Sequence, residues 1–383
     1  MKYRPPRNVF LLGVTSFLND FASEMTLSVF PAFFTSVLKS GAGALGLVEG
    51  VADGAANVIK IYAGRYSDKL ERRKPFIVLG YVVSTATRPL YLLVSSVGGV
   101  LGLRFADRIG KGVRDGARDA VISLSTPPEH MGHAFGFHRA MDTFGGILGP
   151  LTAYFILRAY PGGFNIIFLT AFVAGLLAVA SLFFIKDVRG SLNGNGLSFK
   201  KLAVFPKSFR RYLIALFFLA IGSIPVAVLL LKTQHLGFAL ASIPLFYMFY
   251  SVSYAVFSYA GGHFSDHIGA RVVLRMGYLA LIVGYLVVFM AEGAVTLAIG
   301  FFILGLFPAL TDGVARAFAA ELSPENQRGG AYGLVNAVTG FGLMIAGIGG
   351  GYLWEFVSPM SALIVAGCFV LIGIGVLSTI RKN

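Results

Sequence analysis

Two carboxylates lie one helical turn apart within the first long apolar stretch of the chain. Asp20 and Glu24 are separated by four residues and therefore share one face of a helix. Ionisable side chains inside a membrane-length apolar segment are costly to bury, and they mark proton relays and substrate pathways. A carboxylate that meets an arginine in one conformation and water in another can take up and release a proton. We therefore expect this pair to bind a proton, with Arg104 or Arg108 as its cationic partner.

The stretch DRIGKGVRDGARD at residues 107–119 places seven charges within an otherwise apolar region. Asp107 and Lys111 are four residues apart, as are Lys111 and Asp115, so the spacing predicts ion pairs along one helix face. One interpretation is that this helix, with the two arginines named above, lines a water-filled cavity. The other is a structural ladder of paired charges. That interpretation applies above all to the residues near the end of the stretch: Arg114, Asp115, Arg118 and Asp119.

Further ionisable, polar and aromatic side chains stand at helical spacing in other apolar stretches. Asp142 joins the expected proton and substrate site. The other cavity candidates are Asp53, Asn57, Arg88, Asp312, Arg316, Tyr250 and Tyr254. The two tyrosines share an aromatic face that suits core packing or, alternatively, a stacking wall for an organic solute. Three histidines between residues 130 and 138 fit a loop better than a metal site, so we expect neither metal nor cofactor.

The composition is that of a helical protein embedded in a lipid bilayer. The mean hydropathy is +0.75. Apolar runs of about twenty residues recur along the chain, and each is long enough to cross a hydrocarbon core of ~30 Å. The single cysteine, Cys368, excludes an internal disulfide. The basic N-terminus runs directly into an apolar segment, which predicts an uncleaved first helix. The net charge of +14 is better explained by membrane orientation than by nucleic-acid binding.

Twelve membrane spans are predicted. Their boundaries are 8–37, 44–63, 76–97, 99–125, 134–157, 164–185, 209–231, 240–262, 272–291, 294–320, 330–352 and 360–380. The fourth contains the charged stretch and is inferred from topology. If it did not cross, the basic loops 65–74 and 186–211 would lie on opposite sides of the membrane. If it crosses, twenty basic residues face the cytoplasm and three face outward, which is the positive-inside pattern. We therefore expect a multi-pass protein of the inner (plasma) membrane with both termini cytoplasmic.

An internal repeat divides the chain into two related halves. GRYSDKLERR at 64–73 matches GHFSDHIGAR at 262–271, an offset of 198 residues. PEHMGHAFG at 128–136 matches PENQRGGAYG at 324–333. Self-similarity of this kind is typical of membrane transporters built from two structural repeats. The expected domains are a six-helix bundle at 1–186, a cytoplasmic linker at 187–208 and a second six-helix bundle at 209–383.

These features together resemble the major facilitator superfamily over essentially the whole chain. The loop after span two and its echo in the second half match the family's gating motif, which implies that the gate residues are Gly64, Asp68, Lys69, Arg72, Arg73, Gly262, Asp266 and Arg271. LRFADRIGKG at 103–112 is similar to the family's span-four pattern. GGILGP at 145–150 matches a motif typical of the family's exporters, with packing roles for Gly145, Gly149 and Pro150. The resemblance implies an all-α fold, alternating access and a cavity lined by spans 1, 4, 7 and 10.

The leading functional hypothesis is a monomeric, proton-coupled secondary transporter that moves a small organic solute outward. An importer or a metal-cation carrier of the same fold is the alternative. A sensor or an intramembrane enzyme is the alternative from another class, but the chain shows no paired catalytic motif, and we expect no enzyme activity. The nucleotide-binding pattern G-x-x-x-x-G-K-[ST] is also missing from the sequence, which argues against transport driven directly by ATP.

Overall fold

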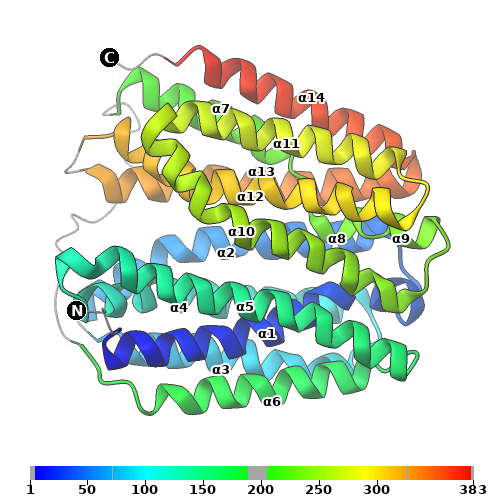
Figure 1. Ribbon diagram of the computed structural model, residues 1–383, viewed down its shortest axis with the longest axis horizontal. Coiled ribbons are helices and arrows are strands. Elements are labelled where there is room, and N and C mark those ends of the chain that lie inside the picture. The colour runs from blue at the N-terminus through cyan, green and yellow to red at the C-terminus, as the bar shows by residue number, and fades with distance from the viewer. Residues whose placement is uncertain (1–4, 71, 189–204, 325–326, 381–383) are drawn as a thin grey trace. The chain divides into compact units, whose positions relative to one another are not determined.

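The computed structural model describes residues 5–70, 72–188, 205–324 and 327–380, and it describes side chains throughout these ranges except at 61–70 and 128. The described residues form helices and contain no strand. Most helices are long, and within each part of the chain they run side by side (Figure 1). This architecture follows from the composition, because a helix satisfies every backbone polar group internally where no water is available.

Six long helices come from the first half of the chain and a further set from the second half. The first set is α1 Arg7–Ser36, α2 Ala42–Leu70, α3 Lys74–Leu90, α4 Val97–Leu124, α5 Met131–Ala159 and α6 Phe164–Leu182. The second set is α7 Lys207–Ile221, α8 Val226–Leu229, α9 Lys232–His235, α10 Ile243–Ile268, α11 Ala270–Met290, α12 Ala294–Glu321, α13 Arg328–Phe356 and α14 Pro359–Ser378. Short 3-10 turns occur at η1 Tyr91–Leu93, η2 Pro128–His130 and η4 Leu240–Ser242.

The all-α prediction with twelve spans in two six-helix bundles is confirmed. Ten segments of the described residues are long and apolar enough to cross a membrane. The other two spans are α1 and α4, with 30 and 28 residues. At ~1.5 Å per residue both exceed the thickness of a hydrocarbon core. The polar residues of α1 and the charges of α4 lower the hydropathy of these two helices.

The helices group into two compact units. One contains residues 1–38, 58–193 and 240–248, and the other contains 39–57, 194–239 and 249–383. Helices α2 and α10 therefore each begin in one unit and end in the other. The division into bundles at 1–186 and 209–383 with a linker at 187–208 stays a prediction.

The seventh span differs from the expected continuous helix at 209–231. Helix α7 ends at Ile221, and the chain becomes helical again only at Val226. Pro225 has no N–H to donate, so it cannot continue the hydrogen-bond ladder of a preceding helix. The buried hydroxyl of Tyr285 bridges the break. It accepts from the N–H of Ile224 at 2.9 Å and donates to the carbonyl of Gly222 at 2.9 Å.

We expect Tyr285→Phe to lower the thermal stability of the detergent-solubilised protein, because it leaves two backbone groups buried without partners. Each such group costs about 1–3 kcal/mol. Loss of folded protein on heating, followed by size-exclusion chromatography, measures the effect. Tyr259→Phe is the control, because Tyr259 lies on α10 with 85% of its surface exposed. Equal stability of the two variants would show that the bridge is dispensable.

A second difference lies after span two, where a loop was expected at 65–74. Helix α2 instead continues to Leu70. Its counterpart α10 likewise continues to Ile268 and ends at Gly269, whose φ of +89° suits glycine. In both halves, the motif therefore begins on a helix that continues beyond the apolar segment detected by hydropathy.

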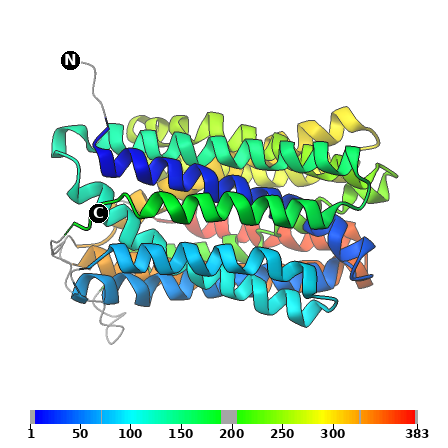
Figure 2. The ribbon, with the colours of Figure 1, turned by 90° about the horizontal axis from the view of Figure 1, so that it is seen from below.

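The repeat also holds at the level of helix packing. Helices α1 and α5 lie side by side in both views (Figures 1 and 2). A Cβ on Gly145 would lie 2.3 Å from the carbonyl oxygen of Phe17. A Cβ on Gly342, 197 residues later, would lie 3.1 Å from the carbonyl oxygen of Phe217. Residues of α1 thus correspond to residues of α7 at an offset of 200, and residues of α5 correspond to residues of α13 at an offset of 197.

Candidate functional site

A polar cluster lies where α1 meets α5. The hydroxyl of Ser16 donates to Oδ1 of Asp142 at 2.6 Å. The carboxyl groups of Asp20 and Asp142 lie close enough to share a hydrogen bond when one of them is protonated. Arg139 lies 3.4 Å from Oδ2 of Asp142, and the amide of Asn19 donates to Oδ1 of Asp20 at 3.2 Å. Two acids from the expected proton site, which are more than a hundred residues apart in the chain, are therefore brought together by α1 and α5.

This pair of carboxyl groups can hold one shared proton. Two carboxylates in direct contact repel each other when both are ionised, so one proton shared between them relieves the repulsion. The pair keeps some access to water, since the side chain of Asp142 is 17% exposed. Hydrogen bonds from Ser16 and Asn19 and the charge of Arg139 stabilise the remaining negative charge. The arrangement can therefore exchange a proton with little rearrangement of its surroundings.

Glu24 lies one turn further along α1 and meets a residue that sequence reasoning missed. The hydroxyl of Tyr247, in the first turns of α10, donates to Oε2 of Glu24 at 2.5 Å. Tyr247 is only 5% exposed. Gly146 leaves space beside the acid, because a Cβ there would meet only Cγ of Glu24 at 3.8 Å. The sequence signal for Tyr247 was weak, since the aromatic face that we singled out runs through Tyr250 and Tyr254.

Arg104 has a different partner from the one expected. Its guanidinium lies 3.3 Å from Oδ2 of Asp107 and 5.3 Å from the ring centroid of Phe30. The residue is 3% exposed, whereas the sequence led us to expect it beside water with Asp20 or Glu24. An arginine three residues before an aspartate on the same helix is already in reach of it, which explains the local pairing. Arg108 is half-buried.

The charged ladder of α4 includes ion pairs that were not expected. Lys111 was the expected partner of Asp107 and Asp115, and its charge does act on Asp115. Asp107 also pairs with Arg104, and Asp115 lies 3.5 Å from Lys60 of α2 and 3.7 Å from Arg118. The sequence of one helix could not reveal the approach of a lysine from another. Asp119 pairs with Arg118 at 2.9 Å.

Arg114 shows that part of the ladder joins helices. It is buried, it donates to the hydroxyl of Ser84 at 2.7 Å, and its guanidinium lies 4.4 Å from the ring centroid of Tyr81. Both partners belong to α3. Hydrogen bonding and a cation–π contact together hold α4 against α3, which fits the structural interpretation of this end of the stretch.

Arg88, a cavity candidate, lies between helices instead. It is 2% exposed. Its guanidinium donates to the side-chain oxygen of Asn19 at 2.8 Å, to Ser23 at 3.1 Å and to the carbonyl of Ala171 at 3.4 Å. These contacts join α3 to α1 and α6. They also orient the asparagine that donates to Asp20.

Gly175 makes room for that guanidinium, and we expect Gly175→Val to destabilise the protein. A Cβ at this position would lie 2.1 Å from Nη1 of Arg88. The larger side chain would displace a buried, fully engaged arginine, and such overpacking costs about 1–3 kcal/mol or more. Thermal unfolding in detergent measures the loss. Gly367→Val on α14 is the matched control, because a Cβ there meets nothing within 4 Å; a similar loss in both variants would contradict this explanation.

The remaining cavity candidates make fewer contacts. Tyr254 donates to Oδ2 of Asp312 at 2.9 Å, and Asp312 and Arg316 are exposed on α12. The amide of Asn57 donates to the backbone carbonyl of Asp53 at 2.9 Å. The role of these residues in a cavity stays a prediction.

The gate motif is described only in part. The surroundings of Gly64 and the side chains of Asp68 and Lys69 lie outside the described part of the structure. Gly262, Asp266 and Arg72 are exposed, whereas Arg73 is buried. The side chain of Arg271 donates to the carbonyl of Ile380 and so joins the start of α11 to the end of α14.

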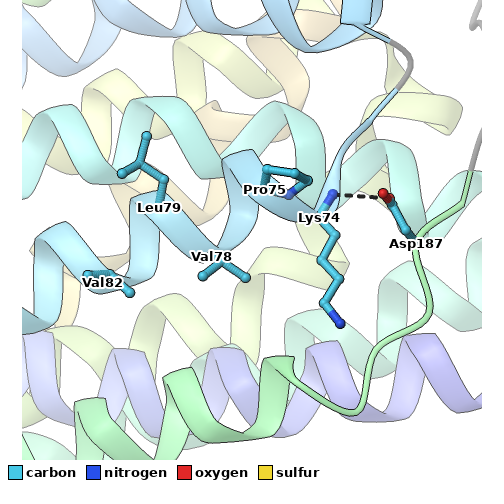
Figure 3. A pocket seen from close by; sticks show the side chains of 6 residues that line it. All are labelled: Lys74, Pro75, Val78, Leu79, Val82 and Asp187. Carbon is cyan, nitrogen blue, oxygen red and sulfur yellow. Dashed lines mark hydrogen bonds between the residues drawn. The ribbon is translucent and has the colours of Figure 1, made fainter.

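A corresponding junction occurs in the first half, and Asp187 is its unpredicted member. Its Oδ1 accepts the backbone N–H groups of Arg73 and Lys74 at 3.4 and 3.2 Å. The ammonium of Lys74 donates to the carbonyls of Phe183 and Ile185 at 3.1 and 2.7 Å. Figure 3 shows Lys74 and Asp187 to one side of the apolar side chains of α3, with the hydrogen bond between them dashed. In each half, a basic residue at the end of the motif or directly after it thus contacts the chain just beyond the last helix of that half.

The comparisons with known proteins agree with this architecture. The family model "Major Facilitator Superfamily" matches residues 12–232 and 212–382. An uncharacterized MFS-type transporter from Methanocaldococcus jannaschii is 34% identical over 364 residues, covering 93% of this chain and 91% of its own. The solved structure of the nucleoside transporter NupG aligns with a TM-score of 0.77 at 16% identity, covering 98% of this chain and 100% of its own. That of a D-xylose-proton symporter aligns with a TM-score of 0.75 at 15% identity, covering 98% and 97%.

Proposed function

The chain belongs to the major facilitator superfamily and is a multi-pass membrane transporter, and we propose that it couples the outward movement of a small organic solute to protons. The observation that carries the proposal is the contact between the carboxyl groups of Asp20 and Asp142. A group that shares one proton can lose it to water on one side of the membrane and regain it on the other. Alternating access converts that exchange into transport.

The coupling site belongs to the first half of the chain alone. At the offsets given by helix packing, Ser16, Asp20 and Asp142 correspond to Leu216, Ala220 and Thr339. None of these three can carry a charge. The second half therefore offers no matching acid pair, and we assign proton binding to α1 and α5.

Glu24 is the proposed link between the proton site and the solute. It lies on the same face of α1 as Asp20 and is held by Tyr247 at 2.5 Å. A solute that displaces the tyrosine would gain a carboxylate partner one turn from the shared proton. The resulting change in local charge would favour release of that proton, which is the order of events that antiport needs. The exporter-type GGILGP sequence on α5 supports outward movement.

Solute-dependent proton movement in proteoliposomes tests the proposal. Candidate solutes are first selected by their effect on the thermal stability of the purified protein. A trapped pH-sensitive dye then reports proton movement when a selected solute is added. Antiport predicts protons moving opposite to the solute. Protons moving with the solute would establish an importer instead, and solute movement without protons would contradict coupling.

We also propose that both termini face the cytoplasm and that residues 187–208 are a cytoplasmic linker between the two bundles. The support is the excess of basic residues on one side, twenty against three. Single cysteines placed in the loops, in a chain that lacks Cys368, would be labelled from outside only where a loop is external. Labelling of a cysteine at position 195 in intact cells would reverse the proposed orientation.

A further inference from the structure

A groove with a basic rim lies between the start of α7 and α13. It has a volume of about 690 Å³. Its rim consists of Lys207, Arg210 and Arg211, and its floor is apolar, with Ile214, Phe217 and Leu334 among the lining side chains. In the described part of the chain, no carboxylate lies within ion-pair distance of the three basic side chains. The charge of the rim is therefore available to a ligand.

At the corresponding place in the first half, two aromatic rings stack against each other. Phe10 and Phe137 lie with their ring centroids 6.1 Å apart. At the offsets of 200 and 197 residues these positions are occupied by Arg210 and Leu334. The exchange of an aromatic pair for an arginine and a smaller side chain both opens the groove and places a positive charge at its mouth.

Two further observations point to an anion. Nε of Arg210 is buried and has no hydrogen-bond partner among the described residues, and such a donor is costly to leave unmet. The first turn of α7 has no side-chain cap, since its N-cap is Pro206. The unmet N–H groups and the helix dipole at this end both favour a negative group.

We propose that this groove binds an anionic phospholipid, with the phosphate at the basic rim and an acyl chain along the apolar floor. Basic pockets between membrane helices recognise anionic lipid headgroups in this way. A soluble anion would use only the rim and would leave the apolar floor uncovered. Only an amphipathic anion matches both parts. The bound lipid would hold the start of α7 in the membrane leaflet in which that end of the helix lies.

Native mass spectrometry of the full chain in neutral detergent tests the proposal. Phosphatidylglycerol and phosphatidylcholine with identical acyl chains are titrated in parallel, and the expected result is preferential binding of phosphatidylglycerol. Lys207→Gln/Arg211→Gln should weaken that binding roughly thirtyfold, if each charge contributes about the usual amount at a membrane surface. Arg7→Gln/Lys186→Gln is the control, because both residues are exposed on the first half.

Three outcomes would overturn the proposal: equal binding of the two lipids, equal loss in the control variant, or binding of glycerol 3-phosphate as tight as that of phosphatidylglycerol. The last result would identify a site for a soluble anion. Leu334→Phe provides a test without any change of charge, since it restores one ring of the pair that fills the first half. It should reduce binding of phosphatidylglycerol, and unchanged binding in this variant would show that the acyl chain lies elsewhere.

Discussion

Asp142→Asn is expected to abolish proton-driven transport while leaving the protein folded. Asparagine has nearly the same shape as aspartate and can still accept the hydrogen bond from Ser16, which is 2.6 Å long in the structure. It cannot ionise, so Asp20 loses the partner with which it shares a proton. Without that pair, a pH gradient has no site through which to act. The expected outcome is complete loss of solute accumulation driven by a pH gradient, with exchange of solute for solute retained.

Dye-reported proton flux and solute accumulation in proteoliposomes measure this result. Asp20→Asn should behave in the same way, because it removes the other member of the pair. Asp119→Asn is the matched control. That aspartate lies on α4 with 42% of its side chain exposed, and its partner is Arg118. Normal gradient-driven accumulation in both Asp20 and Asp142 variants would remove the carboxyl pair from the coupling mechanism.

Gly149→Ala is expected to destabilise the contact between α1 and α5 severely, although it adds one methyl group. The new Cβ would lie 2.3 Å from the carbonyl oxygen of Phe21 and 2.8 Å from the backbone nitrogen of Met25. Both are backbone atoms and cannot rotate away, so the helices must separate. Overpacking of this kind costs about 1–3 kcal/mol or more. Separation would also move Asp142 away from Asp20 and Ser16, so folded yield and coupling should fall together.

Gly136→Ala on the same helix gives a control with the opposite expected sign. A Cβ there meets nothing within 4 Å. Replacing glycine by alanine within a helix normally stabilises it by about 0.5–1 kcal/mol. The midpoint of thermal unfolding should therefore rise or stay unchanged for Gly136→Ala and fall for Gly149→Ala. A common shift in both variants would mean that helix propensity, and not the close approach of α1, controls the result.

The helices and the location of the polar chemistry could be predicted from the sequence. The spacing of Asp20 and Glu24 placed them on one face of α1, and topology identified α4 as a span although its charges hide it from hydropathy. The GGILGP motif located the packing glycines of α5. Each of these inferences uses a property that is local in the chain or is repeated along it.

The partners of the charged groups could not be predicted in the same way. Asp115 contacts Lys60, and Glu24 contacts Tyr247, across separations that no helical period encodes. Arg104 pairs with Asp107 of its own helix, a partner that the expected site did not assign to it. The break in the seventh span was signalled by Pro225, yet the hydroxyl that bridges it comes from Tyr285, 60 residues later. Where several partners far apart in the sequence are suitable, tertiary packing determines which of them a charged or polar side chain contacts.

The shared proton between Asp20 and Asp142 has a thermodynamic consequence under the proposed function. A pair that binds one proton exchanges one proton per transport cycle, so the energy available to each solute molecule has an upper limit. For a neutral solute, a membrane potential of about 100 mV contributes about 2.3 kcal/mol. Each pH unit contributes about 1.4 kcal/mol more. With that potential and a difference of one pH unit, the steady-state concentration ratio of the solute cannot exceed roughly 500-fold, however tightly the solute is bound.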